Sequence, residues 1–282
     1  IARRQRQMCI RDRCILSMTS ECLQLQAMNP NLCIKNDASY HDMYYMNPPA
    51  KDLSKIASSD KVKKVQKDFE ATHVRPQRLM KTLFTDEAYV KANVDEARLM
   101  RRLFDLACNM QSHDTDMQLY SLFTDEECYD LWSCNNLYWY LTHACSPVTD
   151  GLMPYREADL LRNILDRADA ALKEGKNQAT LRFGHESCLL PLVALLELNH
   201  YGESYPDVEK LSEQWRAYDI FPMASNVQFV FFHKKGSNDV LVKVLLNEKE
   251  AKLPVKTDVA PYYHWKDVES YYREKLDKYQ HI

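Results

Sequence analysis

The chain has 282 residues, 45% of them hydrophobic and 27% charged, which is the composition of an ordinary globular protein with a sizeable core. Its formal net charge of −3 argues against nucleic acid as the main partner, and no apolar run is long enough for a transmembrane segment. Only five residues are glycine, and no Gly-rich phosphate loop occurs. The sequence therefore predicts a mostly helical protein that lacks a nucleotide-binding loop.

Residues 1–13, IARRQRQMCIRDR, carry five arginines and no apolar period. We interpret them as a non-native scar outside the fold. Apolar residues then recur at helical spacing and predict a helix over residues 14–28, which Asn29-Pro30 terminates. Residues 14–36 are interpreted as a remnant of an α/β domain.

Residues 37–175 are predicted to form an inserted α-helical domain. Apolar periodicity indicates its helices at Lys51–Phe69, Val94–Met110, Glu126–His143 and Tyr155–Lys173. The last of these helices ends at Gly175, a residue suited to a helix C-terminus. Thr124, with Glu127 three residues later, forms the pattern of a capping box at a helix start.

Residues 176–282 differ in pattern and are predicted to form the C-terminal part of the α/β domain. A strand is expected over Ala179–Gly184, followed directly by a buried helix over Ser187–Leu198. Two hairpin strands and a final helix are expected at Asn226–Lys234, Val240–Leu246 and Asp267–Tyr279. The predicted fold class is α/β, a sheet flanked by helices with a large helical insertion.

Nine cysteines are spread along the chain, and none forms a C-x-x-C pair. This spacing gives no support for a zinc site, and we expect neither a metal nor another cofactor. Most of the cysteines are expected to be small buried thiols. A disulfide among Cys128, Cys134 and Cys145 stays open for an exported protein.

The segment Gly184-His185-Glu186 lies between the expected buried strand and the expected buried helix. Ligands of open α/β sheets gather beyond the C-terminal ends of strands, and a helix N-terminus favours an anion. Gly184 permits a sharp turn and the close approach of a ligand. A histidine can donate to phosphate oxygens, and a protonated carboxyl can deliver a proton to a leaving group. The alternative is a structural histidine beside a solvated glutamate.

Several other polar groups are interpreted as structural. His113-Asp114-Thr115-Asp116 is a cluster typical of turns, although its residue types also suit a metal. His143 lies in an aromatic segment and is expected in the core or at an interface. Arg98, Arg101 and Arg102 could face a polyphosphate, but a solvated helix face is favoured.

The stretch LRFGHESCLLPLVALLEL, residues 181–198, resembles the C-terminal active-site segment of the histidine acid phosphatases, and is most similar to the bacterial multiple inositol polyphosphate phosphatase (phytase-like) branch. Residues 13–30, 36–49 and 221–254 resemble the arginine-bearing helix, the entry to the helical domain and the late hairpin of that family. Their order along the chain matches the family, and together they cover most of residues 13–282.

This resemblance implies phosphoryl transfer to a nucleophilic histidine followed by hydrolysis, without metal. His185 matches the second phosphate-binding histidine, and Glu186 matches the proton donor of the His-Asp version of the motif. The inositol polyphosphate branch more often places the acid one residue later, where this chain has Ser187. Arg13 matches the phosphate-binding arginine, but it borders the presumed scar, and its origin stays open.

The family's nucleophile is the histidine of an Arg-His-Gly-x-Arg motif at the end of the first strand. None of the nine histidines here follows an arginine or precedes a glycine. We therefore expect this chain to lack the nucleophile and the N-terminal strands, and to be inactive alone.

The predicted function is hydrolysis of phosphomonoesters in inositol polyphosphates, with a small phosphorylated molecule as the partner. One alternative is a catalytically silent phosphate-binding or interaction module on the same fold. Another is a helical protein in which His185 and Glu186 are purely structural. The family implies a periplasmic, cell-surface or secreted location.

Overall fold

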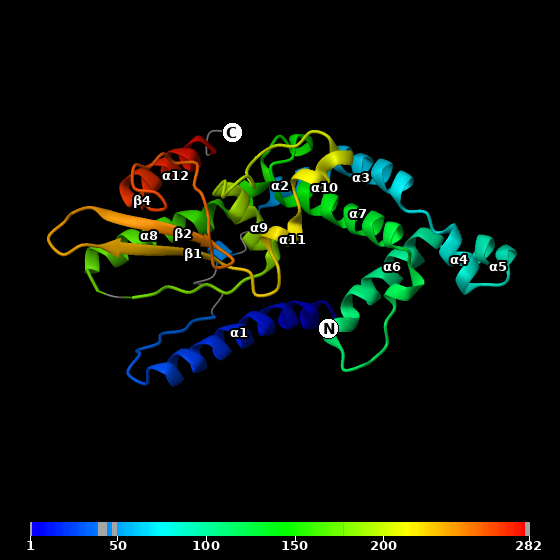
Figure 1. Ribbon diagram of the computed structural model, residues 1–282, viewed down its shortest axis with the longest axis horizontal. Helices are drawn as coiled ribbons and strands as arrows, with labels where there is room; N and C mark the ends of the chain where they lie inside the picture. Colours follow the sequence, from blue (N-terminus) through cyan, green and yellow to red (C-terminus); the bar gives the residue numbers. More distant parts are fainter. Residues whose placement is uncertain (1, 39–43, 47–49, 177, 280–282) are drawn as a thin grey trace.

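The computed structural model describes residues 2–38, 44–46, 50–176 and 178–279, with side chains from residue 13 onward. The protein is mostly helical and carries one small antiparallel sheet near its C-terminal end (Figure 1). The α/β class with a large helical section is therefore confirmed. Parts of the segment 36–49 lie outside the described residues.

The elements follow one another in chain order from the N-terminal helix to the C-terminal helix. The α-helices are α1 (Ala2–Met28), α2 (Lys51–Ala57), α3 (Asp60–His73), α4 (Gln77–Leu83), α5 (Glu87–Asn93), α6 (Glu96–Asn109), α7 (Asp125–His143), α8 (Ala158–Glu174), α9 (Glu186–Leu195), α10 (Leu211–Gln214), α11 (Ala217–Ile220) and α12 (Trp265–Tyr279). The strands are β1 (Val227–His233), β2 (Val240–Leu246), β3 (Lys249–Glu250) and β4 (Tyr263–His264). Short 3₁₀ turns include η1 (Tyr44–Met46) and η5 (Met153–Glu157).

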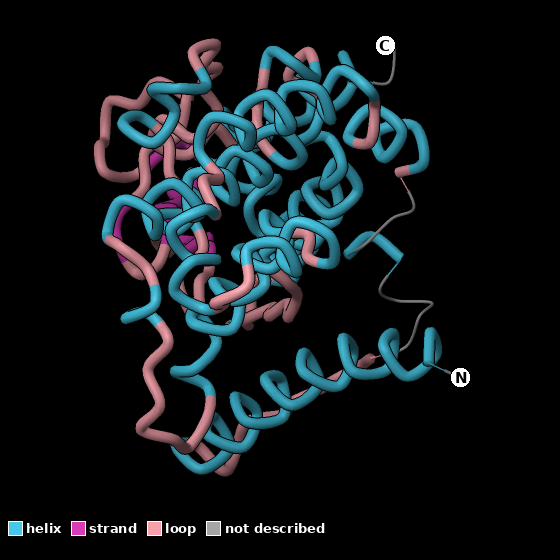
Figure 2. Tube along the Cα trace, turned by 90° about the vertical axis from the view of Figure 1, so that its right-hand side faces the viewer, coloured by secondary structure: helices cyan, strands magenta, loops and turns pink. Residues whose placement is uncertain are grey.

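Helix α1 contains the predicted helix 14–28 and extends back to Ala2. It lies along one side of the molecule, apart from the other helices (Figures 1 and 2). Three of its large apolar side chains, Leu16, Leu23 and Met28, are more than 60% exposed. Helix α1 is therefore held by few contacts, and Cys14 supplies two of them, as described below.

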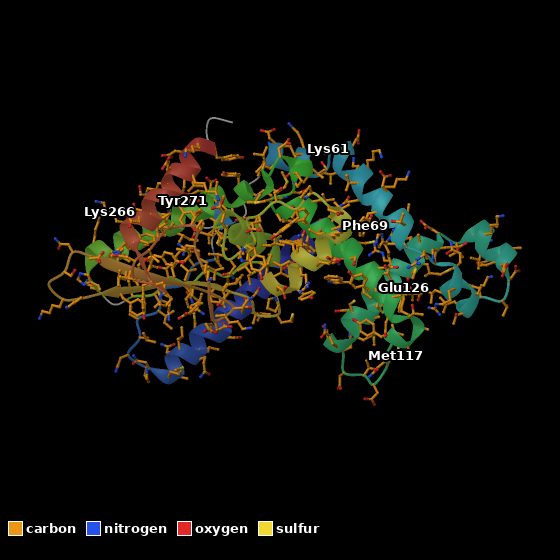
Figure 3. All side chains as sticks on the ribbon, turned by 45° about the horizontal axis from the view of Figure 1, so that its top comes forward. Lys61, Phe69, Met117, Glu126, Lys266 and Tyr271 are labelled. Atoms are coloured by element: carbon orange, nitrogen blue, oxygen red, sulfur yellow. The ribbon has the colours of Figure 1, made fainter. Side chains whose placement is uncertain are left out.

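The single helix expected over residues 51–69 is wrong, because two helices occupy this stretch. Helix α2 ends at Ala57, and the hydroxyl of Ser59 accepts from the Val62 amide at 3.4 Å and begins α3. A serine side chain that caps the next helix competes with continuation of the previous one. Helix α3 then packs its buried Phe69 toward α7 (Figure 3).

Helix α7 connects two hydrophobic clusters. The smaller cluster contains apolar side chains of α4, α5 and α6, and α7 contributes Leu131 to it. The larger cluster contains Leu137, Tyr140 and Leu141 of the same helix. The predicted capping box begins α7: Thr124 Oγ1 accepts from the Glu127 amide at 3.2 Å, and Glu127 Oε2 accepts from the Thr124 amide at 3.0 Å.

Helix α9 lies inside the larger cluster. It packs against η5, α7 and α8, and its residues from Leu190 to Leu195 are all buried. The helix is apolar on every face, so it has no side that could be solvated at low cost. Helix α8 ends at Gly175 with φ of 64°, the left-handed conformation that glycine adopts without strain.

Strand β2 is the centre of the sheet. It pairs antiparallel with β1 from Val240 to Leu246, and its opposite edge pairs with β3 and β4. Both predicted hairpin strands are therefore confirmed. The side chains of Val242, Val244 and Leu246 are buried, and α12 covers this face of the sheet (Figures 1 and 3).

The strand predicted over residues 179–184 is not formed. This segment is extended, but it pairs with no strand of the described chain, and Leu181 is exposed. Strand β1 likewise has a partner on one edge only within the described residues. A strand exists through hydrogen bonds to a neighbouring chain segment, so a strand-like sequence without such a neighbour remains irregular. The division into segments 14–36, 37–175 and 176–282 stays a prediction.

The capping box of α7 generates a stability prediction. Thr124→Ala removes the acceptor of the Glu127 amide and should lower the free energy of unfolding by about 1 kcal/mol. Thr124→Ser is the matched control, because serine keeps the hydroxyl and should retain most of the stability. Urea denaturation followed by circular dichroism measures both. Equal midpoints for Thr124→Ala and wild type would show that the cap contributes nothing.

Candidate functional site

His185 is the N-cap residue of α9, and Glu186 lies in the first helical turn. His185 has extended backbone angles, φ of −117° and ψ of 166°, and its carbonyl accepts from the Cys188 and Leu189 amides. The His185 side chain makes no capping hydrogen bond to this helix end within the described part of the chain. Its first amides are therefore available to an anion, with the helix dipole in favour.

Both residues lie at an open cleft of about 2260 Å³. The cleft is lined by the extended segment 178–185, by β1, and by α8, which contributes the apolar residues Leu160, Ile164 and Ala168. Figure 1 shows the extended chain after α8 running beside the hairpin. The cleft therefore lies between a segment that pairs with no described strand and β1, which pairs with one.

The structure brings Arg13 to the same cleft as His185 and Glu186. Arg13, Ser17 and Glu21 of α1 follow one another at intervals of four residues, so they share one helix face, and all three line the cleft. Arg13 and Glu186 are exposed, and His185 is half-buried. Arg13, His185 and Glu186, the three residues predicted from the sequence, thus line the same cleft.

Cys14 links α1 to the start of α9. Its Sγ lies 3.5 Å from His185 Nε2 and donates to the Gly184 carbonyl at 3.6 Å. Burial raises the pKa of this thiol, partly offset by Arg13, so it stays protonated and can act as a donor. Cys14 therefore restricts the orientation of the imidazole. Its position immediately after an arginine in RCILSMTS gave no sign of this role.

Gly184 is important for close packing and does not adopt a left-handed conformation. A Cβ atom at this position would lie 3.1 Å from the Cε atom of Met46 in η1. Met46 is held in turn by α9, because the Cys188 thiol donates to its carbonyl at 3.1 Å. The expected close approach at Gly184 is thus made by a protein side chain.

Two arginines that sequence reasoning did not assign also line the cleft, Arg182 and Arg167. Arg182 comes from the extended segment, and its Nη2 donates to Asn163 Oδ1 of α8 at 2.7 Å. Arg167 lies on α8 and is exposed. A charged residue inside the apolar run TLRFG was the available signal for Arg182.

The polar residues that were interpreted as structural in the sequence lie in the core, in a turn and in a surface ion pair. His143 is buried, and burial lowers its pKa to about 4, so it is neutral in the core. Residues 113–115 form a turn through a bond from the Thr115 amide to the His113 carbonyl. Arg101 pairs with Glu70 at 2.7 Å on the α6 surface.

Cys128, Cys134 and Cys145 are free thiols, so the disulfide left open for them is not formed. Within residues 13–38, 44–46, 50–176 and 178–279, no group of three His, Cys, Asp or Glu side chains could hold a metal ion. The helices of this same part include none with the length and hydropathy of a membrane span.

The family model of the histidine phosphatase superfamily (branch 2) matches residues 26–247. The chain therefore belongs to this superfamily. Its matched region contains His185, Glu186, the helical section and the β1–β2 hairpin.

Relatives of known identity agree with this assignment. Human multiple inositol polyphosphate phosphatase 1 is 28% identical over 134 residues, which cover 43% of this chain and 27% of the human protein. The solved Bifidobacterium longum multiple inositol polyphosphate phosphatase in complex with phosphate superposes with a TM-score of 0.56 at 19% identity, covering 86% of this chain and 60% of that one. Its complex with inositol hexasulfate gives a TM-score of 0.51, covering 83% and 56%. The chain thus spans about a quarter of the human relative and somewhat over half of the bacterial structures.

A buried carboxyl group lies behind the site. Glu157, the last residue of η5, is 3% exposed, and its Oε2 has no hydrogen-bond partner among the described residues. Burial is the largest cause that raises its pKa, to about 8, with a smaller opposing effect of Arg156. Glu157 is therefore neutral at pH 7. Burial raises the pKa of the neighbouring Cys188 thiol, and Glu157 raises it further once it is ionised.

Glu157 generates a prediction for the pH dependence of stability. Folded Glu157 keeps its proton up to about pH 8, whereas the ordinary pKa is 4.5, so the folded state binds more protons between these values. The free energy of unfolding contributed by this group falls as pH rises through that window, by roughly 5 kcal/mol at most. Glu157→Gln should remove this slope in denaturant titrations between pH 5 and pH 9.

The matched control is Glu174→Gln, at the exposed end of α8. This variant should keep the wild-type pH dependence. A Glu157→Gln protein whose stability declines with pH as steeply as wild type would contradict the assignment.

Proposed function

We propose that the site at the start of α9 belongs to a phosphomonoesterase that acts on inositol polyphosphates through a phosphohistidine intermediate. The observation that carries the proposal is that Arg13, His185 and Glu186 line one cleft at a helix N-terminus. The superfamily match and the names of the relatives support phosphatase chemistry and this substrate class. The proposal includes a periplasmic, cell-surface or secreted location, which the family resemblance of the sequence implies.

Each residue has a role that suits its position. The Arg13 guanidinium donates hydrogen bonds to phosphate oxygens, and His185 donates a hydrogen bond to the same phosphate group. The free amides at the start of α9 add to the positive potential. Glu186 is exposed at the cleft and can reach the ester oxygen of a bound substrate. These groups stabilise the phosphate and the leaving group, and none of them is the nucleophile.

The reaction needs a second histidine opposite the leaving group. This nucleophile attacks phosphorus, the bond to the ester oxygen breaks, and the alcohol leaves with the proton of Glu186. Water then hydrolyses the phosphohistidine. No histidine of this chain lies in an Arg-His-Gly-x-Arg motif, so the proposal places the nucleophile outside residues 1–282.

The same absence favours a second candidate function for the chain by itself. Residues 1–282 could bind phosphate without turning it over, as a silent binding module on the same fold. Phosphate binding by titration separates both candidates from a purely structural His185-Glu186 pair.

Turnover by residues 1–282 tests the assignment of the nucleophile. We expect no release of phosphate above background from an aryl phosphate or from phytate, because in-line attack requires a group opposite the leaving group. The control is a longer form that carries the Arg-His-Gly motif, assayed in parallel. Clear turnover by residues 1–282 that Glu186→Gln abolishes would mean that the nucleophile or the family mechanism is assigned wrongly.

Glu186→Gln in the active longer form tests the general acid. An alkoxide is a poor leaving group, so loss of the acid should slow phytate hydrolysis by ~10²–10⁴-fold. An activated aryl phosphate leaves without a proton and should be affected far less. Glu213→Gln, on α10 and outside the cleft, is the matched control and should leave both rates unchanged. Unchanged phytate turnover in Glu186→Gln would rule out this role.

A further inference from the structure

Arg182 has an unusual environment for a charged side chain. It is half-buried at the cleft, and its Nε is fully buried without a hydrogen-bond partner among the described residues. Its Nη2 donates to Asn163 Oδ1, and the Tyr45 phenol also interacts with the guanidinium. The guanidinium also lies over the Tyr45 ring, 5.9 Å from its centroid. This position holds a cation with one buried donor, Nε, that is unpaired among the described residues.

No carboxylate is among the groups that shift the pKa of Arg182. Burial lowers the pKa of the Arg182 guanidinium, the Tyr45 phenol opposes this shift, and a second cation, Arg167, lowers the pKa further. None of the ion pairs among the described residues includes Arg167, and carboxylates on the same helix pair with other arginines, Asp159 with Arg162 and Asp166 and Asp169 with Arg273. Arg182 is the partly buried member of this pair, so its charge is the one that benefits from a partner, and exposed Arg167 adds a second positive charge beside it. An anion bound at the cleft would contact both arginines.

The helix geometry explains why the two arginines meet. Asn163, which accepts from Arg182, and Arg167 are four residues apart on α8 and therefore share one helix face. Both arginines line the cleft that contains His185. Arg182 precedes His185 by three residues of extended chain, a span of about 10 Å. A ligand that carries several phosphates around a small ring can reach both positions.

We propose that Arg182 and Arg167 form a second oxyanion-binding position in the cleft, which holds one phosphate group of a polyphosphorylated ligand while another lies at His185. The ligand class of this proposal rests on the proposed function. The added subsite determines the orientation of the ligand in the cleft. Arginine forks bind tetrahedral oxyanions with two donors, and the Nε of Arg182 is unpaired among the described residues.

Calorimetric titration of residues 1–282 with myo-inositol hexakisphosphate tests the subsite. Arg167→Gln and Arg182→Gln should each weaken binding by about tenfold, the effect of losing a charge-assisted hydrogen bond. Arg98→Gln is the matched control, because Arg98 is an exposed α6 arginine away from the cleft, and it should change affinity by less than about twofold. The proposal would be overturned if Arg167→Gln and Arg182→Gln bound hexakisphosphate as tightly as wild type.

Arg167→Gln also separates a loss of binding from a loss of folding. Because the Arg167 side chain is exposed, its replacement should leave the melting temperature unchanged. A loss of affinity in Arg182→Gln alone, together with a lower melting temperature, would identify Arg182 as a structural residue and overturn the proposal.

The arginine Nε–H resonances separate this inference from the proposed function. In a His185→Asn variant, added hexakisphosphate should still shift the Arg182 resonance, whether or not His185 takes part in turnover. A shift with inorganic phosphate as well identifies free phosphate as a ligand, and a shift with hexakisphosphate alone identifies the group on the larger molecule. No shift with either probe would refute the subsite.

Discussion

The structure depends on the enclosure of α9, a helix that is apolar on every face. Such a helix must be surrounded, and η5, α7 and α8 do so with the largest buried cluster of the protein. Only its N-terminal end can then reach solvent. His185 and Glu186 lie at that end, so the requirement to bury the helix also fixes the place where polar chemistry is available.

The helices and the hairpin could be predicted because their signals are local. Periodicity, the Thr124 capping box and Gly175 define α7 and α8, and two alternating runs around a polar loop define β1 and β2. The residues His185 and Glu186 were identified from a strand-to-helix transition, which the structure retains as an extended segment entering α9.

The features that were missed depend on partners distant in the chain. Residues 179–184 have the composition of a strand, but no segment of the described chain pairs with them. The position of Arg182 depends on its contact with Asn163, 19 residues away in the chain. That of Cys14 depends on its contact with His185, 171 residues away. Nothing in the local pattern specifies such pairs, because they arise only when α8 and α1 are placed against the extended segment.

The packing at Gly184 has a consequence for how the protein tolerates sequence change. A methyl group at residue 184 would require the end of the Met46 side chain to move by a few tenths of an ångström. Positions 46 and 184 are therefore thermodynamically coupled, and the effects of substitutions at the two sites should not add. A shorter side chain at residue 46 is the permissive background in which a larger residue at 184 becomes acceptable. Which residues position 184 tolerates therefore depends on the side chain at position 46, more than a hundred residues away in the chain.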